Sequence, residues 1–367
     1  MTSSDFVEVL VVGDGLVGLA CARASAARGL ATCLVGRRRP GMASVAAAGF
    51  LAPTVDPAKG AALAFMIAAR TRYESFVAEL RESTGHSVPF ALDGILRLPG
   101  SEREAAAMAA APDPMSRWLA PADVAELEPA LSAPLGARFH ADDGMVDNQR
   151  LLRVLDESIA LGAIPRLNAE VRRVELAGSL AAVELDDGRR IRCRHLVLAG
   201  GAWQPLVGGL PRHLPVLPLR GQMMSLVGTP VSRPVFGFGG YVIPRLADRQ
   251  VIVGSTSEAV GFTLGTTDAA LTGFRDVAAR LIPSLARADE VRSWSGLRPM
   301  TFDGLPIIGP DPDVPSILYA CGHGRNGILL APVTGDVIAD LAAGAPASHD
   351  ITPFSIARFP ASVHSSA

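Results

Sequence analysis

The chain has 367 residues, 49% of them apolar, and a formal net charge of −2 at pH 7. This length and apolar content predict two cores or one large composite core and argue against extensive disorder. The near-neutral charge gives no electrostatic reason to expect a nucleic acid or a membrane surface as a partner, so we expect a small-molecule ligand.

Four cysteines are scattered along the chain without a C-x-x-C pair or ligand-like spacing. This pattern predicts neither a disulfide framework nor a metal site. The N-terminal MTSSDFVEVLVVG lacks the basic start and apolar core of a signal peptide, and no apolar run approaches the roughly 18 residues that span a bilayer. We therefore expect a cytoplasmic protein without an integral membrane segment.

The first predicted elements are a strand over residues 6–12, a glycine-rich turn, a helix, and a strand over residues 31–35. The turn, GDGLVG, has the G-x-G-x-x-G spacing of dinucleotide sites. Gly13 makes the tight turn, Gly15 lets backbone approach a pyrophosphate, and Gly18 permits close helix packing. An ordinary βαβ turn is the alternative, and the spacing does not separate NAD, NADP and FAD.

The second strand leads into GRRRPG, at the point where such sites usually carry a ribose-binding carboxylate. Gly36 occupies that place, and the three arginines after it would also suit the extra phosphate of NADP. However, Lys59 is the only lysine among the 34 basic residues, so an arginine cluster carries little information in this chain. Asp14, inside the glycine turn, is assigned no role, because a side chain there should point away from phosphates.

The rest of the chain alternates between helical and strand patterns. Helices are predicted over residues 60–83 and 268–281, and an apolar strand over residues 195–199 would return to the parallel sheet. Between them, VLPLRGQMMSL, GGYVIPRL and RQVIVGSTS are typical of a second, largely antiparallel sheet. The predicted fold class is α/β, as an α+β composite in which a Rossmann-like domain is interleaved with an antiparallel-sheet domain.

Several separated motifs resemble the glycine oxidases of the D-amino acid oxidase family of FAD-dependent amine oxidases. They are SVAAAGFLAP, DGMVDNQRLL, LPLRGQMM, GGYVIPR, VIVGSTSE and the segment 294–344, and the resemblance extends from Val9 to about Ala343. It implies an FAD-binding domain of residues 1–85, 140–213 and 296–345, a substrate domain of residues 86–139 and 214–295, and a C-terminal tail, 346–367. FAD would be noncovalent, since the neighbours of Gly296 include no cysteine for a tether.

The resemblance also implies which residues contact the cofactor. They are Gly13, Gly15, Leu16, Val17, Gly18, Gly36, Arg37, Ala43, Ser44, Ala48, Gly49, Phe50, Val171, Gly322, His323, Gly324, Arg325, Asn326, Gly327, Ile328 and Leu329. A helix that begins near Gly327 would stabilise the negative charge of a reduced flavin. Because Gly36 replaces the usual acid, we expect somewhat weaker FAD retention and a gain in affinity when Gly36 is replaced by glutamate.

For catalysis, the resemblance implies that Arg298 grips the substrate carboxylate, with Tyr241 beside it and Arg325 as a second arginine. The implied reaction is hydride transfer from the substrate Cα to flavin N5, with O2 reduced to H2O2. Glycine, sarcosine and small D-amino acids are the expected substrates, and the product could feed thiamine biosynthesis. Gly324 stands where glycine oxidases commonly have an aromatic residue, so there could be room for a substrate side chain.

Two alternatives stay open from the sequence. One is a D-amino acid dehydrogenase or oxidase of the same fold with larger substrates or another electron acceptor. The other is a flavin- or NADP-binding protein without turnover, for which the arginine cluster is the argument. Related oxidases often self-associate, so a homo-oligomer is also expected.

Overall fold

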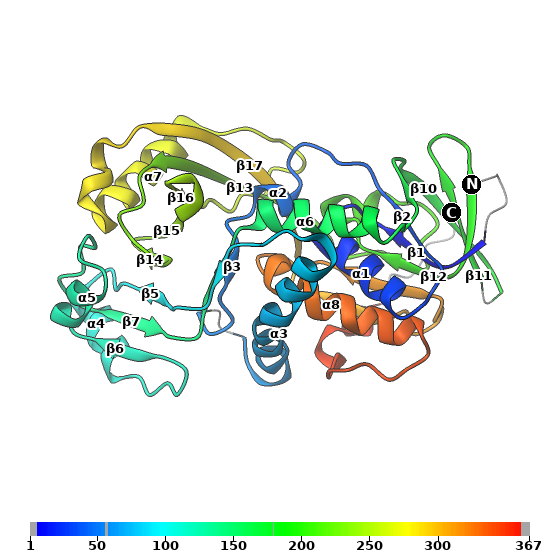
Figure 1. The fold of residues 1–367 in the computed structure, drawn as a ribbon, viewed down its shortest axis with the longest axis horizontal. Coiled ribbons are helices and arrows are strands. Elements are labelled where there is room, and N and C mark those ends of the chain that lie inside the picture. The colour runs from blue at the N-terminus through cyan, green and yellow to red at the C-terminus, as the bar shows by residue number, and fades with distance from the viewer. Residues whose placement is uncertain (1–5, 56–57, 179, 361–367) are drawn as a thin grey trace.

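The computed structural model describes residues 6–55, 58–178 and 180–360, so the end of the predicted tail, 361–367, lies outside the described residues. Its two large sheets lie at opposite ends of the molecule (Figure 1). In the first, β12 (Arg190–Leu198) pairs with β1 along one edge and with β11 and then β19 along the other. The remaining order is β10-β11-β12-β1-β2-β9, with β18 beside β19. The bounds are β1 Phe6–Val12, β2 Thr32–Val35, β9 Arg166–Leu167, β10 Val171–Ala177, β11 Leu180–Leu185, β18 Ile307–Pro310 and β19 Ile317–Cys321.

The centre of the first sheet is parallel and apolar. Leu10 of β1 lies opposite Leu196 of β12 and Cys33 of β2, and all three are buried. Such continuous apolar strands are typical of parallel sheets that are covered on both faces. The predicted strands at residues 6–12 and 195–199 are therefore confirmed, although β12 begins five residues earlier.

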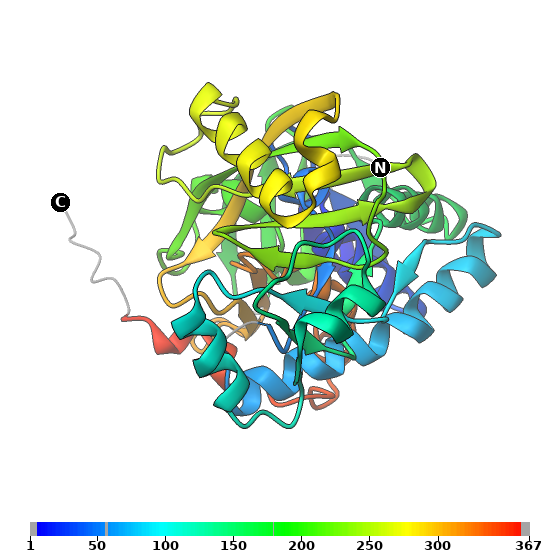
Figure 2. The same ribbon diagram turned by 90° about the vertical axis from the view of Figure 1, so that its left-hand side faces the viewer.

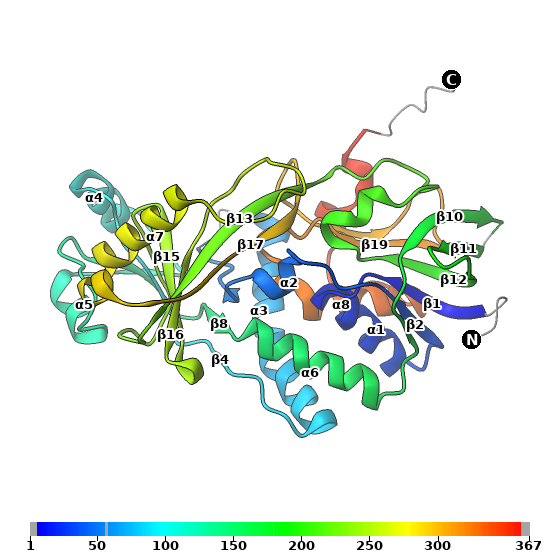
Figure 3. The ribbon, with the colours of Figure 1, turned by 90° about the horizontal axis from the view of Figure 1, so that it is seen from above.

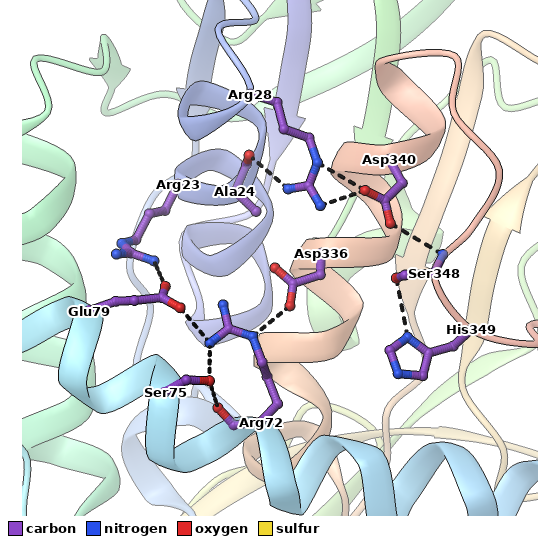
Figure 4. Close-up of polar contacts among 10 residues, drawn as sticks. All are labelled: Arg23, Ala24, Arg28, Arg72, Ser75, Glu79, Asp336, Asp340, Ser348 and His349. Carbon is purple, nitrogen blue, oxygen red and sulfur yellow. Dashed lines mark hydrogen bonds and ion pairs between the residues drawn. The ribbon is translucent and has the colours of Figure 1, made fainter.

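Helices α1 (Leu16–Ala27), α3 (Gly60–Thr84), α6 (Asn148–Leu161) and α8 (Gly327–Ala342) gather around one apolar cluster with this sheet. Ion pairs join three of them at the surface (Figure 4). Glu79 of α3 pairs with Arg23 of α1 at 3.1 Å and with Arg72 at 2.7 Å, and Arg72 also reaches Asp336 of α8 at 2.9 Å. The relative positions of α1 and α8 are thus held by charge as well as by packing.

The second sheet has the order β17-β13-β16-β15-β14-β5-β7-β6 and is antiparallel except between β14 and β5. Helix α7 (Asp268–Leu281), with the predicted bounds, packs on it and lies in front of it in Figure 2. The long strands β13 and β17 extend from this sheet toward the first one (Figure 3). The bounds are β5 Ile95–Arg97, β6 Arg117–Leu119, β7 Ala137–His140, β13 Val216–Val227, β14 Val235–Gly237, β15 Gly240–Arg245, β16 Gln250–Gly254 and β17 Glu290–Thr301.

Short elements connect the two halves. A three-stranded sheet is formed by β3 (Phe50–Leu51), β8 (Gly144–Val146) and β4 (Phe90–Ala91). The other helices are α2 Ala43–Ala46, α4 Glu102–Ala110, α5 Pro121–Leu127 and the 3-10 turns Gly201–Leu206, Leu246–Asp248, Pro283–Arg287, Thr352–Phe354 and Ile356–Arg358. Within the described residues, no helix combines the length and the apolarity that crossing a membrane requires.

Candidate functional site

Two adjoining cavities lie between the sheets. The first, of about 420 Å³, opens at the carboxyl ends of β1, β2 and β12, where open parallel sheets bind ligands. The second, of about 560 Å³, lies against the second sheet. Both are lined by Ala43, Ala47, Gly324, Arg325 and Ile328. One extended ligand could therefore occupy the first cavity and present one end to the second.

The glycine turn forms one wall of the first cavity. Gly13 has φ of +130°, and a Cβ there would lie 2.2 Å from the carbonyl oxygen of Ala199, so glycine is required. Helix α1 begins directly after Gly15 without an acidic residue in its first turn. The Leu16 N–H donates to Ser44 Oγ at 3.0 Å. A positive helix end beside small residues fits the pyrophosphate of a dinucleotide such as FAD.

The structure brings most of the predicted cofactor residues to these cavities. The first is lined by Gly13, Gly15, Val17, Gly36, Arg37, Ala43, Ser44, Val171, Gly322, His323, Gly324, Arg325, Gly327 and Ile328, and the second by Ala48, Gly49, Phe50 and Asn326. Leu16, Gly18 and Leu329 line neither cavity and are buried. Their expected contact with the cofactor therefore has no support from the geometry, and their role here is packing.

The arginine cluster after β2 is neutralised by acidic partners. Arg37 pairs with Asp186 at 2.8 Å and with Glu170 at 3.3 Å. Arg38 pairs with Asp156 at 2.6 Å, and Arg39 pairs with Glu170 at 2.5 Å. Each guanidinium therefore has a carboxylate in place of a 2′-phosphate, so the pattern that had suggested NADP is an ion-pair network.

Gly36 packs directly on Asp14. A Cβ at Gly36 would lie 2.6 Å from Asp14 Cβ and 2.8 Å from the Asp14 backbone nitrogen. Since backbone would have to move to admit any side chain, we expect glutamate at Gly36 to weaken FAD binding, contrary to the expectation from the sequence. Asp14 fills the space beside position 36, a contact between two turns that no local sequence pattern indicates.

A segment over residues 43–50 lines both cavities and is held by donors from three distant elements. Asn148 Nδ2 donates to the carbonyl of Ser44 at 2.9 Å, and Trp294 Nε1 donates to that of Ala46 at 3.0 Å. Arg245 Nη2 donates to the carbonyl of Ala48 at 2.5 Å. Sequence analysis assigned these donors no role, although Asn148 and Arg245 stand within the motifs DGMVDNQRLL and GGYVIPR.

In the second cavity, Arg298 extends from β17 over a glycine of the neighbouring strand. Its Nη1 donates to the carbonyl of Thr256 at 2.8 Å and its Nη2 to Ser255 Oγ at 2.7 Å. A Cβ at Gly221 would lie 2.4 Å from both terminal nitrogens. Gly221 therefore provides the space in which the guanidinium lies. Burial lowers the pKa of Arg298, and the nearby charge of Arg325 acts in the same direction.

An aromatic wall faces this arginine. Tyr241 packs edge-on against Phe50 at 4.8 Å, and Phe236 lies 4.7 Å from Phe50. Burial raises the pKa of Tyr241, so its hydroxyl is neutral and can act as a hydrogen-bond donor. Phe236 was not predicted. A cation beside a neutral hydroxyl and apolar rings suits a small molecule with one carboxylate.

The turn before α8 closes the junction of the cavities. His323 Nε2 lies 3.1 Å from Thr334 Oγ1, and burial lowers the pKa of His323 to about 3, so the ring is neutral near pH 7. Gly324 has φ of +55°, and a Cβ there would lie 2.5 Å from Met300 Sδ. The Tyr73 hydroxyl donates to the carbonyl of Ile328 and holds the first turn of α8.

Comparison with known proteins agrees with this geometry. The family described as FAD dependent oxidoreductase (DAO) matches residues 8–341. The chain is 34% identical over 348 residues to the bifunctional protein ThiO/ThiG of Nostoc sp., covering 91% of this chain and 52% of that protein. It is 31% identical over 368 residues to the glycine oxidase of Geobacillus kaustophilus, covering 96% and 97%.

The crystal structure of glycine oxidase from Geobacillus kaustophilus has a TM-score of 0.89 to this chain at 28% identity, covering 97% of this chain and 100% of that one. The chain spans about half the length of the bifunctional relatives that it matches, between 52% and 55%. The family match includes the glycine turn, both cavities and all but the last residue of α8. The chain therefore belongs to the DAO family of FAD dependent oxidoreductases, and FAD is its cofactor.

Proposed function

We propose that this protein oxidises glycine or another small amine that carries a carboxylate, such as sarcosine or a small D-amino acid. The observation that carries the proposal is the Arg298 guanidinium, set in the second cavity between Gly221 and two acceptors, the Ser255 hydroxyl and the Thr256 carbonyl. FAD, when bound, supplies the hydride acceptor. Loss of the hydride and of one proton leaves the substrate as an imine, which water hydrolyses to an oxo acid with release of ammonia or, from sarcosine, of methylamine.

The protein's own groups bind and orient the substrate. Arg298 is proposed to hold the carboxylate through its two terminal nitrogens, and the neutral Tyr241 hydroxyl is proposed to donate to the same group. Arg325, which lines both cavities, adds a second positive charge. Two cations near the amine disfavour its ammonium form, which helps to present the neutral amine that hydride loss requires. We assign no general base.

Several finer proposals follow from the relatives. Glycine as substrate is supported by the glycine oxidase of Geobacillus kaustophilus, and a link to thiamine biosynthesis by the ThiO/ThiG proteins. We also propose O2 as electron acceptor, with H2O2 as product, together with a cytoplasmic location and self-association.

The proposed domain division follows the two large sheets. Strands of the first sheet come from residues within 1–85, 140–213 and 296–345, and strands of the second come mainly from residues within 86–139 and 214–295. Strand β17 runs across position 296 and places Trp294 and Arg298 on one continuous element. The proposed FAD-binding and substrate domains are therefore linked through the cavity wall itself.

Anaerobic mixing of the purified holoenzyme with single amines tests the proposal. We expect glycine, sarcosine or a small D-amino acid to bleach the flavin, and Arg298→Met to require much higher amine concentrations. The exposed Arg103 supplies the matched control, Arg103→Met, which should behave as wild type. No bleaching by any of these amines would overturn the proposal. The yield of H2O2 in air is then compared with the reduction of a dye under argon. A high peroxide yield indicates an oxidase, and dye reduction without peroxide indicates a dehydrogenase.

A further inference from the structure

Asp14, at the glycine turn, has one carboxylate oxygen in an ion-pair network and one that no described residue meets with a hydrogen bond. The residue is 6% exposed and lines the first cavity. Its Oδ2 accepts from Arg166 of β9 and lies 3.6 Å from Arg38 Nε. Its Oδ1 is buried and has no hydrogen-bond partner among the residues that the structure describes. A buried oxygen of this kind is unfavourable unless a ligand supplies the donor.

Two opposing effects act on the charge of the Asp14 carboxylate. Burial raises the pKa of its carboxyl, while Arg166 and Arg38 act in the opposite direction. The two arginines lie on the Oδ2 side, so they orient the carboxylate and leave Oδ1 as the acceptor. They also offset the repulsion that a carboxylate beside a phosphate-binding turn would otherwise cause.

The other carboxylate that lines the first cavity does not have a free oxygen. Within the described part of the chain, that second acid is Glu170. Its Oε1 pairs with Arg37 at 3.3 Å and its Oε2 with Arg39 at 2.5 Å. Gly36, at the end of β2, brings no side chain at all and gives its N–H to the carbonyl of Leu167 at 3.1 Å. Of the two acids that line the first cavity, Asp14 is therefore the one with an oxygen available to accept a hydrogen bond from an uncharged donor of the ligand.

We infer that Asp14 Oδ1 accepts a hydrogen bond from a ribose hydroxyl of the adenosine half of FAD. Dinucleotide sites ordinarily supply this acceptor from the end of the second strand, which in this chain is Gly36. The acid has moved to the glycine turn, and the absence of a side chain at Gly36 makes room for it. Arg166 acts as a positioning residue. This assignment concerns the cofactor and does not depend on which amine is oxidised.

FAD analogues that lack the adenosine 2′- or 3′-hydroxyl test the inference. The dissociation constants of FAD and of both analogues are measured by flavin fluorescence, with cofactor exchanged into the full-length holoenzyme. For the wild type, we expect at least one analogue to bind about tenfold more weakly than FAD. Asp14→Ala should weaken FAD to a similar extent and reduce the discrimination to about twofold or less, with the near-isosteric Asp14→Asn in between.

Asp276→Asn is the matched control, because Asp276 is exposed on α7 and lines neither cavity, so the variant should keep the wild-type ratio between FAD and the analogues. If the wild type binds FAD and both analogues equally, or if Asp14→Ala retains full discrimination, Asp14 does not hold the ribose. Should Asp14→Ala fail to fold, Asp14→Asn and the wild-type comparison decide the question by the same two criteria. None of these measurements requires turnover, so a failure of the proposed amine oxidation would be seen separately.

Discussion

Replacement of Gly221 by alanine probes the carboxylate anchor without changing any charged residue. The new Cβ would lie 2.4 Å from Nη1 and Nη2 of Arg298 and 2.5 Å from its Cζ, where ordinary contact begins near 3.4 Å. The guanidinium must therefore move by about 1 Å. Because the atoms in conflict are the end of a flexible side chain, the fold should tolerate the change, and what is lost is the position of the charge.

The expected loss follows from the hydrogen bonds of that guanidinium. Its bonds to Thr256 and Ser255, at 2.8 and 2.7 Å, cannot both survive the shift, and a carboxylate aligned with the present geometry would lose at least one charged hydrogen bond. Such a bond contributes about 1.5–3 kcal/mol. This corresponds to a rise of roughly tenfold to somewhat more than a hundredfold in the KM for glycine or whichever amino acid proves to be the substrate.

Steady-state kinetics on Gly221→Ala, with FAD content and melting temperature measured on the same preparation, give the result. FAD content should not change, because Gly221 is not one of the predicted cofactor residues and does not line the first cavity. The control is Gly273→Ala on α7, an exposed position whose Cβ would have no atom within 4 Å. It should leave KM unchanged and stabilise the fold by about 0.5–1 kcal/mol. An unaltered KM in Gly221→Ala would refute the role given to Arg298.

Gly36→Glu should lower the free energy of unfolding by about 1–3 kcal/mol, because the new side chain overpacks against Asp14. The variant should also bind FAD more weakly, and tighter binding in a fluorescence titration would contradict the steric argument. Arg245→Met should lower the free energy of unfolding in urea by about 1.5–3 kcal/mol, because the Ala48 carbonyl loses its buried hydrogen-bond donor. A variant as stable as the wild type would show that this contact is dispensable. Burial lowers the pKa of His323 to about 3, below its ordinary 6.5, so the neutral ring stabilises the fold above about pH 6.5 and this contribution falls as the pH drops toward 3. His323→Gln should remove a slope of up to about 1.4 kcal/mol per pH unit from stability measured between pH 6.5 and 5, and identical slopes would exclude the residue as its source.

The elements that were predicted correctly from the sequence are those that local patterns specify. The strand at residues 6–12, the glycine turn and helix α7 are each specified by residues within one short segment, through apolar periodicity and turn chemistry. Family motifs added the two arginines and Tyr241, which the structure places on the second cavity. Their contact with a substrate stays a prediction.

The residues that sequence analysis missed act between segments that are far apart in the chain. Arg245 meets Ala48, Trp294 meets Ala46, and Gly221 leaves space for Arg298. A pattern along one segment carries no information on such pairs. The revised expectation at Gly36 has the same cause, because it rests on the packing of Gly36 against Asp14, 22 positions earlier in the chain.

The alternation of side chains along β15 and β17 explains how one sheet face both lines the second cavity and holds residues 43–50. In β17, Trp294, Gly296 and Arg298 are spaced by two residues and so project from the same face. Trp294 holds the Ala46 carbonyl, Gly296 would place a Cβ 2.3 Å from Ala46 Cβ, and Arg298 lines the second cavity.

Strand β15 repeats the arrangement. Tyr241 faces the second cavity, and Arg245, four residues on, holds the Ala48 carbonyl. The apolar side chain between them, Ile243, packs in one cluster with Ala46 and Ala48. The same two strands thus carry the proposed substrate anchors and hold the segment that lines the cofactor cavity. Because a slip of one residue would turn every one of these side chains away, the register of the sheet fixes the substrate end relative to the cofactor end.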